Sequence, residues 1–120
     1  PFQETEKYFA KSAVFVNTSK YEGFPNTFVQ ALMYNVPILS LAVNPDRFLD
    51  KYSVGYCAGG SFQNLVNGLL LLTENKGVYE AISKNTAEYV EENHNIKMIC
   101  EDFLYAIGLR RIERVSARFR

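Results

Sequence analysis

Two short apolar runs, separated by a loop and an amphipathic segment, constrain the fold of this chain most. The runs are Ala13-Val-Phe-Val16 and Pro37-Ile-Leu-Ser-Leu41, and runs of this kind are typical of buried strands in a parallel sheet. Between them, Phe28, Ala31 and Leu32 recur at helical spacing. A strand, a helix and a second strand in this order predict one unit of an α/β fold.

The rest of the chain continues the alternation of strands and helices. Residues 3–11 have a helical pattern with Tyr8 and Phe9 facing inward, and Val54-Gly-Tyr-Cys57 has the pattern of a third strand. Further helices are expected after Ser61, over about 76–92, and from 96 to Gly108. Three short strands make a small sheet, so we expect further strands upstream and interpret the chain as a fragment of a longer protein.

Polar residues and apolar spacing also predict the ends and inner faces of the helices. Asn26 is expected as an N-cap, Asn35 as a left-handed C-cap, Asp46 as the cap of a short helix through Leu49, and Ser61 as the cap of the next helix. In that last helix the expected core stripe consists of Phe62, Leu65, Val66, Leu69 and Leu70.

Composition excludes several classes of function. The 120 residues include 13 basic and 13 acidic side chains, so no charge excess favours nucleic acid as a partner. The longest aliphatic stretch, residues 69–72, is far shorter than a membrane span. Cys57, Cys100 and His94 are too widely spaced for a metal cluster, and the cysteines are expected to be buried free thiols of a reducing, cytoplasmic compartment.

The segment from Glu22 to Gln30 is the candidate binding site. It begins the helix between the first two strands, and helix N-termini attract anions such as phosphate. Gly23 allows close approach of a ligand, and the backbone near Asn26 and Thr27 can hold a diphosphate. Gln30 lies one turn further on, within reach of a ribose. The alternative is an ordinary cap at Asn26 with solvated Glu22 and Gln30.

The same segment carries a resemblance. Ser19-x-x-Glu22-Gly-Phe-Pro-Asn-Thr-Phe-x-x-Ala31-x-x-x-x-x-Pro37 resembles the signature of family 4 (group 1) glycosyltransferases of GT-B fold. The resemblance is specific over 19–37 and follows the order of elements over 3–107. It implies a Rossmann-like parallel sheet that forms part of the C-terminal, nucleotide-sugar-binding domain, residues 1–108, followed by a basic tail, residues 109–120.

The resemblance also implies roles for the site residues. Glu22 takes the first position of the family's Glu-x(7)-Glu motif, which contacts the donor sugar, and is the candidate catalytic residue. Gln30 takes the second position, which holds the ribose. The diphosphate is expected to meet the residues between them, which are Gly23, Phe24, Pro25, Asn26 and Thr27.

The implied activity is that of a retaining hexosyltransferase. A sugar would pass from a nucleotide-diphosphate donor to a glycan or lipid-linked acceptor, in surface polysaccharide or glycolipid biosynthesis, with no cofactor and no metal. The acceptor would bind an N-terminal domain of the same protein, which this chain lacks, so the chain alone is expected to be inactive.

Some residues depart from the family pattern and leave alternatives open. Gln30 is neutral where the family has a carboxylate, and residues 42–46 lack the family's glycines. A nucleotide-sugar-binding module without turnover, or a sugar-nucleotide epimerase, are the alternatives. The tail from Arg110 to Arg120 contains five Arg and an apolar stripe. It is a solvated extension, a helix that packs on the missing domain, or a peripheral contact with the inner face of the membrane.

Overall fold

The computed structural model describes residues 2–108, without the side chains of residues 2, 3 and 96–98. The chain divides into two compact units, Pro1–Val90 and Glu91–Arg120. The first unit contains the sheet and the candidate site. The predicted basic tail, residues 109–120, lies outside the described residues.

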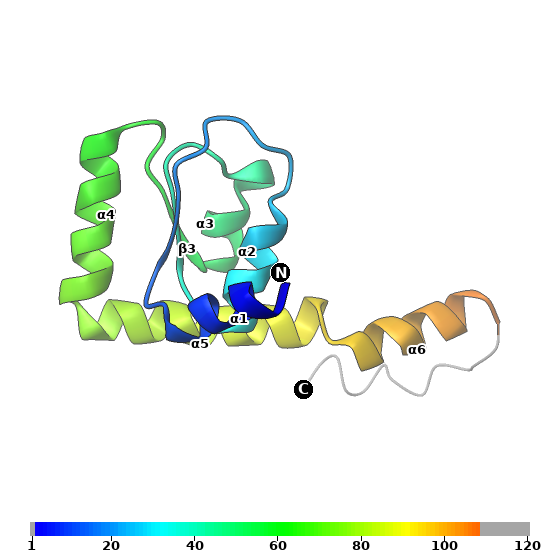
Figure 1. Ribbon diagram of the computed structural model, residues 1–120. Coiled ribbons are helices and arrows are strands. Elements are labelled where there is room, and N and C mark those ends of the chain that lie inside the picture. Colours follow the sequence, from blue (N-terminus) through cyan, green and yellow to red (C-terminus); the bar gives the residue numbers. More distant parts are fainter. Residues whose placement is uncertain (1, 109–120) are drawn as a thin grey trace. The chain divides into compact units, whose positions relative to one another are not determined.

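The first unit is built on a parallel sheet of three strands in the order β1-β2-β3. The strands are β1 (Phe15–Asn17), β2 (Ile38–Ser40) and β3 (Gly55–Cys57), and β3 is labelled in Figure 1. The last residues of the strands, Asn17, Ser40 and Cys57, are in register with one another. This arrangement confirms the predicted α/β fold with a Rossmann-like parallel sheet.

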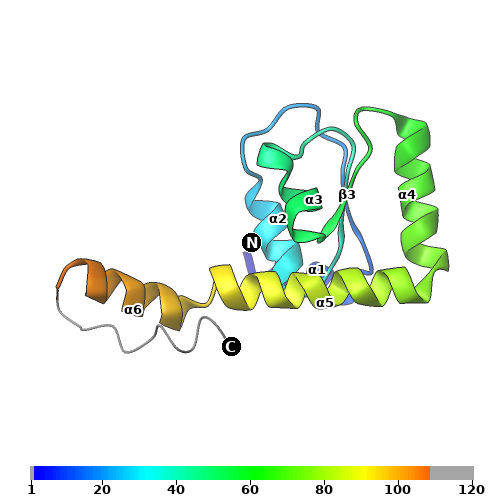
Figure 2. The same ribbon diagram turned by 180° about the vertical axis from the view of Figure 1, so that it is seen from behind.

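One helix precedes the first strand and others follow each strand, as the sequence predicted. The helices are α1 (Phe2–Lys11), α2 (Asn26–Met33), the 3-10 helix η1 (Pro45–Arg47), α3 (Phe48–Tyr52), α4 (Phe62–Glu74), α5 (Lys76–Asn93) and α6 (Ile96–Ala106). Within the first unit, α2 and α3 lie on one side of the strands and α4 lies on the other (Figures 1 and 2). The sheet is therefore the middle layer of this unit.

Each face of the sheet has its own apolar core. On the first face, Ile38 of β2 packs in a cluster with Phe28 and Leu32 of α2 and Leu49 of α3. On the second face, Leu39 packs with residues of α4 and α5, which are Leu65, Leu72 and Ile82. Neighbouring residues of β2 thus point to opposite faces, and both faces are covered, as a central parallel strand requires.

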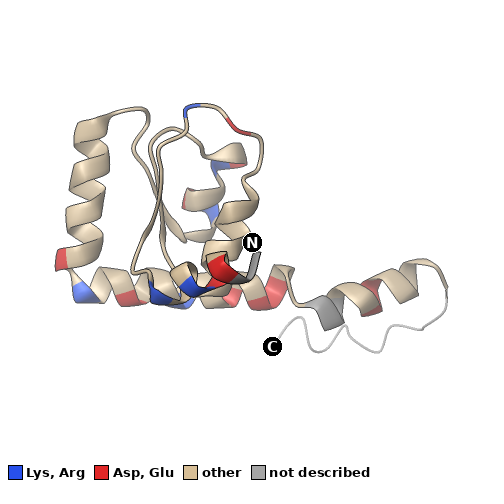
Figure 3. Cartoon of the chain, viewed as in Figure 1, with Lys and Arg blue, Asp and Glu red and all other residues tan. Residues whose placement is uncertain are grey.

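The predicted core stripe of α4 is wrong in its orientation. Leu65 is buried, but Phe62, Val66, Leu69 and Leu70 are all exposed. The helix instead faces the sheet with Leu65, Gly68 and Leu72, where a Cβ on Gly68 would lie 2.8 Å from Leu39 Cδ1. A small sheet covers only a narrow stripe, and the glycine brings the helix backbone close. Figure 3 shows that α4 carries no charged residue before Glu74.

Side chains of helix α5 form hydrogen bonds with backbone carbonyls just before each of the three strands. Tyr79 Oη donates to the Ala13 carbonyl at 2.8 Å, Ser83 Oγ to the Asn35 carbonyl at 3.0 Å, and Asn85 Nδ2 to the Ser53 carbonyl at 3.0 Å. These carbonyls lie just before β1, β2 and β3 in the chain. The helix therefore crosses the amino ends of the strands and leaves their carboxyl ends free for a binding site.

Two predicted helix ends are confirmed and two are wrong. Ser61 Oγ accepts a hydrogen bond from the Asn64 amide at 3.2 Å, and Asn35 has a left-handed φ of 59° after α2. Asn26, however, is the first residue of α2, and the extended Pro25 takes the N-cap position. The N-cap position of the short helix α3 is taken by Arg47 and not by Asp46, and the Leu49 amide in its first turn donates to Asn44 Oδ1 at 2.9 Å.

Two expectations of burial are also wrong. Phe9 is buried as predicted, but the Tyr8 side chain is 75% exposed. Both cysteines are free, yet Cys57 is only half-buried and Cys100, in α6, is exposed. Helical spacing placed Tyr8 and an apolar setting placed the cysteines, and neither tells how much of an element its neighbours cover.

Candidate functional site

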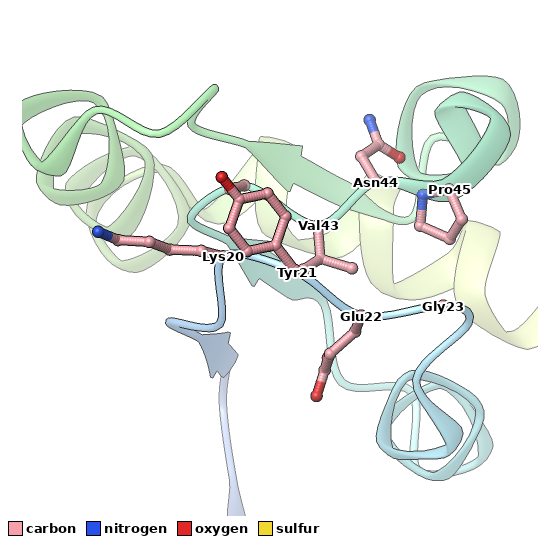
Figure 4. Close-up of a pocket in the computed structure, with 8 residues that line it drawn as sticks. Lys20, Tyr21, Glu22, Gly23, Val43, Asn44 and Pro45 are labelled. Atoms are coloured by element: carbon pink, nitrogen blue, oxygen red, sulfur yellow. The ribbon is translucent and has the colours of Figure 1, made fainter.

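The candidate site is a pocket of about 510 Å³ at the carboxyl ends of β1 and β2. Lys20, Tyr21, Glu22 and Gly23 form one side, in the loop after β1. The other side is the loop after β2, with Ala42, Val43, Asn44 and Pro45. Ligands of open parallel sheets bind at this end of the strands. Figure 4 shows Glu22 and Lys20 extending in different directions from the loop.

The Glu22 carboxylate is held by a residue that the sequence analysis did not single out. Asn17, the last residue of β1, donates from Nδ2 to Glu22 Oε2 at 3.0 Å. The other end of the same amide, Oδ1, accepts a hydrogen bond from the Ser19 backbone at 2.8 Å. Asn17 is buried, with 7% of its surface exposed, whereas Glu22 is exposed. A buried amide thus anchors an exposed carboxylate.

The start of α2 lies next in the chain after these residues. Its first intrahelical contact is the hydrogen bond from the Phe28 amide to the Pro25 carbonyl at 3.0 Å. The amides of Asn26 and Thr27 come before it and have no acceptor within a helix. Both residues are exposed, and Gln30 is half-buried one turn later. The helix start therefore presents donors to a ligand.

Two of the predicted site residues have a packing role. The Phe24 ring packs edge-on against Phe28 at 6.2 Å and against Phe48 at 5.0 Å between centroids. Pro25 is buried beneath the start of α2. These contacts tie the loop that carries Glu22 to α2 and α3. Of the predicted residues, Glu22 and Gly23 line the pocket described here, whereas Phe24, Pro25, Asn26, Thr27 and Gln30 do not.

The second wall of the pocket is held by Asn44. Besides accepting from the Leu49 amide of α3, Asn44 donates from Nδ2 to Asp50 Oδ2 at 2.9 Å. The next residues after Pro45 are unusual, because Asp46 and Arg47 both have left-handed φ values of 51° and 56°. Two successive non-glycine residues in this conformation are uncommon. The two Asn44 bonds, to the Leu49 amide and to Asp50, hold this turn in place.

Ser40, between Asn17 and Cys57 in the sheet, is the least satisfied polar residue near the site. Its side chain is fully buried, and Oγ has no hydrogen-bond partner among the described residues. Asn17 and Ser40 are paired in register, so their side chains point to the same face of the sheet. Sequence reasoning treated Ser40 only as part of an apolar run.

The described part of the chain offers no metal centre and no membrane span. No group of three or more His, Cys, Asp or Glu side chains in residues 2–108 is placed to hold a metal ion. Among the helices described, none is both long enough and apolar enough to cross a bilayer. Lys20 is the basic residue in the pocket lining, and Glu22 is the acidic one.

The chain shows sequence similarity to a known protein. The chain is 24% identical over 99 residues to a curated protein of Haemophilus influenzae that is named an uncharacterized glycosyltransferase. The match covers 80% of this chain and 28% of that protein, so the chain spans about a quarter of its relative's length. No protein-family model and no solved structure matches the chain.

The sequence analysis missed Asn17, Val43 and Asn44, although a signal was available. Asn17 directly follows a buried strand, and Asn44 follows the next strand by a few residues. Because the carboxyl ends of parallel strands meet at one edge of a sheet, polar residues there converge on one site. Their hydrogen bonds depend on how the loops fold, and the order of residues does not give that.

Proposed function

We propose that this chain is the donor-binding part of a retaining glycosyltransferase of family 4 with the GT-B fold. In this proposal the chain binds a nucleotide-diphosphate sugar at the carboxyl ends of β1 and β2. A further domain of the same protein binds a glycan or lipid-linked acceptor, in surface polysaccharide or glycolipid synthesis. The proposal is supported by the similarity to a glycosyltransferase and by the resemblance of residues 19–37 to the family signature.

One observation carries the proposal: Glu22 lines a pocket directly before the start of a helix. A carboxylate accepts hydrogen bonds from sugar hydroxyls, and a helix start donates them to phosphate. A nucleotide-diphosphate sugar has both groups joined in one molecule. Glu22 would therefore meet the sugar, and the backbone from Gly23 to Thr27 would meet the diphosphate.

In a retaining transfer the leaving diphosphate develops negative charge as the bond to the anomeric carbon breaks. The amides at the start of α2 point donors at that charge without reorganising, which is an efficient form of stabilisation. Glu22 would orient the sugar and bind its hydroxyls. We propose that no metal takes part, since the amide donors at the start of α2 meet this charge.

A titration of the 120-residue chain tests this assignment. UDP-glucose or GDP-mannose should shift the backbone NMR signals of residues 17–30 and 42–45, and leave those of α5 unchanged. Glu22→Ala should weaken binding of the sugar nucleotide about tenfold, which corresponds to about 1.4 kcal/mol. Glu80→Ala, which removes an exposed carboxylate of α5 paired with Lys76 at 3.7 Å, is the matched control. Shifts spread over α5, or none at all, would overturn the assignment.

Gln30 provides a second test. Where the family has a carboxylate, this chain has an amide, and a charge-assisted hydrogen bond is about twice as strong as a neutral one. Gln30→Glu should therefore keep or strengthen binding of UDP or GDP, and Gln30→Ala should weaken it. Calorimetric titration of the three chains decides the matter, and equal affinities would remove Gln30 from the site.

The second candidate function is a nucleotide-sugar-binding module without turnover. The neutral Gln30 in the ribose position favours it. The two functions differ in the longer protein, where only the enzyme would release free nucleotide diphosphate when donor and acceptor are both supplied.

A further inference from the structure

Asn17 has no part in the resemblance or in the predicted site, yet its buried side chain makes two hydrogen bonds beside the pocket. Its amide has one fixed orientation, because the Ser19 backbone N–H can only donate and the Glu22 carboxylate can only accept. The oxygen must face the first and the nitrogen the second. Burial of Asn17 at 7% exposure limits the access of water to this amide, although Glu22 itself is exposed.

The two hydrogen bonds act on the same short loop. The bond to Ser19 closes the turn directly after β1, and the bond to Glu22 fixes the side chain five residues further on. Glu22 Oε2 is engaged in this way, so the exposed carboxylate meets a ligand with its orientation already set. A free glutamate side chain loses rotamer entropy when it is immobilised. Asn17 removes part of that cost before the ligand arrives.

We propose that Asn17 is a positioning residue that holds the Glu22 carboxylate ready for a sugar hydroxyl of the donor. The proposal rests on the proposed function, because it takes Glu22 as the group that meets the sugar. Asparagine suits the role better than aspartate, since the amide donates to a carboxylate that a second carboxylate would repel.

The isosteric change Asn17→Asp tests this directly. It keeps the acceptor for the Ser19 amide and replaces the donor to Glu22 with a repelling oxygen. The affinity for UDP-glucose should fall about tenfold, because Glu22 loses the hydrogen bond that orients its carboxylate. The affinity for UDP, which has no sugar for Glu22 to bind, should change by less than about twofold. GDP-mannose and GDP can be compared in the same way as UDP-glucose and UDP.

A matched control separates positioning from general damage to the fold. Asn85→Asp makes the same change in α5, where Asn85 Nδ2 donates to the Ser53 carbonyl before β3 at 3.0 Å. This variant should lose stability, measured by urea unfolding, but keep the ratio of UDP-glucose to UDP affinity. An equal fall of both affinities in Asn17→Asp would overturn the inference, because a merely structural residue acts on both.

A double-mutant cycle shows whether Asn17 acts through Glu22. In a Glu22→Ala background, Asn17→Asp should cost no further affinity for UDP-glucose, because the carboxylate that it positions is gone. An additive loss would overturn the inference while leaving the proposed function intact. If the unsubstituted chain binds neither UDP-glucose nor GDP-mannose, the proposed function fails and the inference fails with it.

Discussion

At the scale of single residues, two buried polar side chains at the carboxyl end of the sheet differ in their hydrogen bonding. Asn17 uses both ends of its amide, whereas Ser40 buries a hydroxyl that has no partner among the described residues. Burying a polar group without a partner costs about 1–3 kcal/mol. The buried Ser40 hydroxyl is therefore expected to lower the stability of the folded chain.

Ser40→Ala should raise the free energy of unfolding by about 1 kcal/mol, because it removes the unsatisfied hydroxyl and keeps the fold. Ser61→Ala is the opposite case, since Ser61 Oγ caps α4, and it should lower the same free energy by about 1 kcal/mol. Urea unfolding followed by circular dichroism measures both. If the two variants lose stability equally, the Ser40 hydroxyl has a partner after all.

At the scale of elements, the close contact between β2 and β3 depends on Gly55. A Cβ at this position would lie 1.9 Å from the Ile38 carbonyl oxygen, a backbone atom that cannot move aside. Gly55→Ala should cost more than about 2 kcal/mol of stability. Gly77→Ala should instead add about 0.5 kcal/mol, because Gly77 is in the first turn of α5 and its nearest neighbour, Asn75 Oδ1, is 3.6 Å away. Thermal unfolding compares the two, and a stable Gly55→Ala chain would mean that the strands can separate without cost.

The elements themselves were predictable because each rests on a local pattern. The runs 13–16 and 37–41 gave two strands in the right order, and Phe28, Ala31 and Leu32 are all buried as expected. The inner face of α4 was not predictable, because apolar residues surround that helix and the contact with Leu39 is made at Gly68. Which face a helix buries depends on its partner, and that information is not local.

In the site, too, the features that depend on local sequence were predictable and those that depend on contacts between elements were not. Glu22 and Gly23 were found from the loop before a helix, and both line the pocket. The N-cap at Asn26 was wrong because Pro25, already extended, takes that position. The second wall, with Val43 and Asn44, comes from a separate loop that is brought close only by the pairing of β1 with β2.

At the scale of the whole molecule, an aromatic cluster ties stability to pH. The Tyr89 ring of α5 packs against Phe48 at 5.0 Å and Tyr52 at 4.5 Å between centroids. Burial, together with the neighbouring Tyr52 hydroxyl, raises the pKa of Tyr89 above the ordinary value of 10.0. Above that value the unfolded chain loses the tyrosine proton more readily than the folded chain does, so stability falls as pH rises.

Tyr89→Phe should therefore weaken the loss of stability above pH 10.0, and leave the dependence at neutral pH unchanged. Tyr21→Phe removes a hydroxyl from a ring that is 93% exposed and serves as the control. Urea unfolding at a series of alkaline pH values measures the difference. Identical curves for Tyr89→Phe and the parent chain would show that Tyr89 does not titrate differently in the two states.

The chain alone should transfer no sugar. Transfer requires donor and acceptor to be held together in a cleft that excludes water, and the described pocket presents its walls from one side of a single sheet. The assay follows radiolabelled sugar from UDP- and GDP-sugars into a mixture of lipid and oligosaccharide acceptors. Turnover by the 120 residues alone would place the whole catalytic machinery in this chain.

The two free thiols give the molecule built-in reporters. Cys57 is half-buried at the end of β3, in register with Ser40, and Cys100 is exposed in α6 of the second unit. A maleimide label should therefore attach to Cys100 first and reach Cys57 only when the carboxyl edge of the sheet opens. The rate of Cys57 labelling therefore measures how often that edge opens. A nucleotide sugar bound beside β1 and β2 would lower this rate.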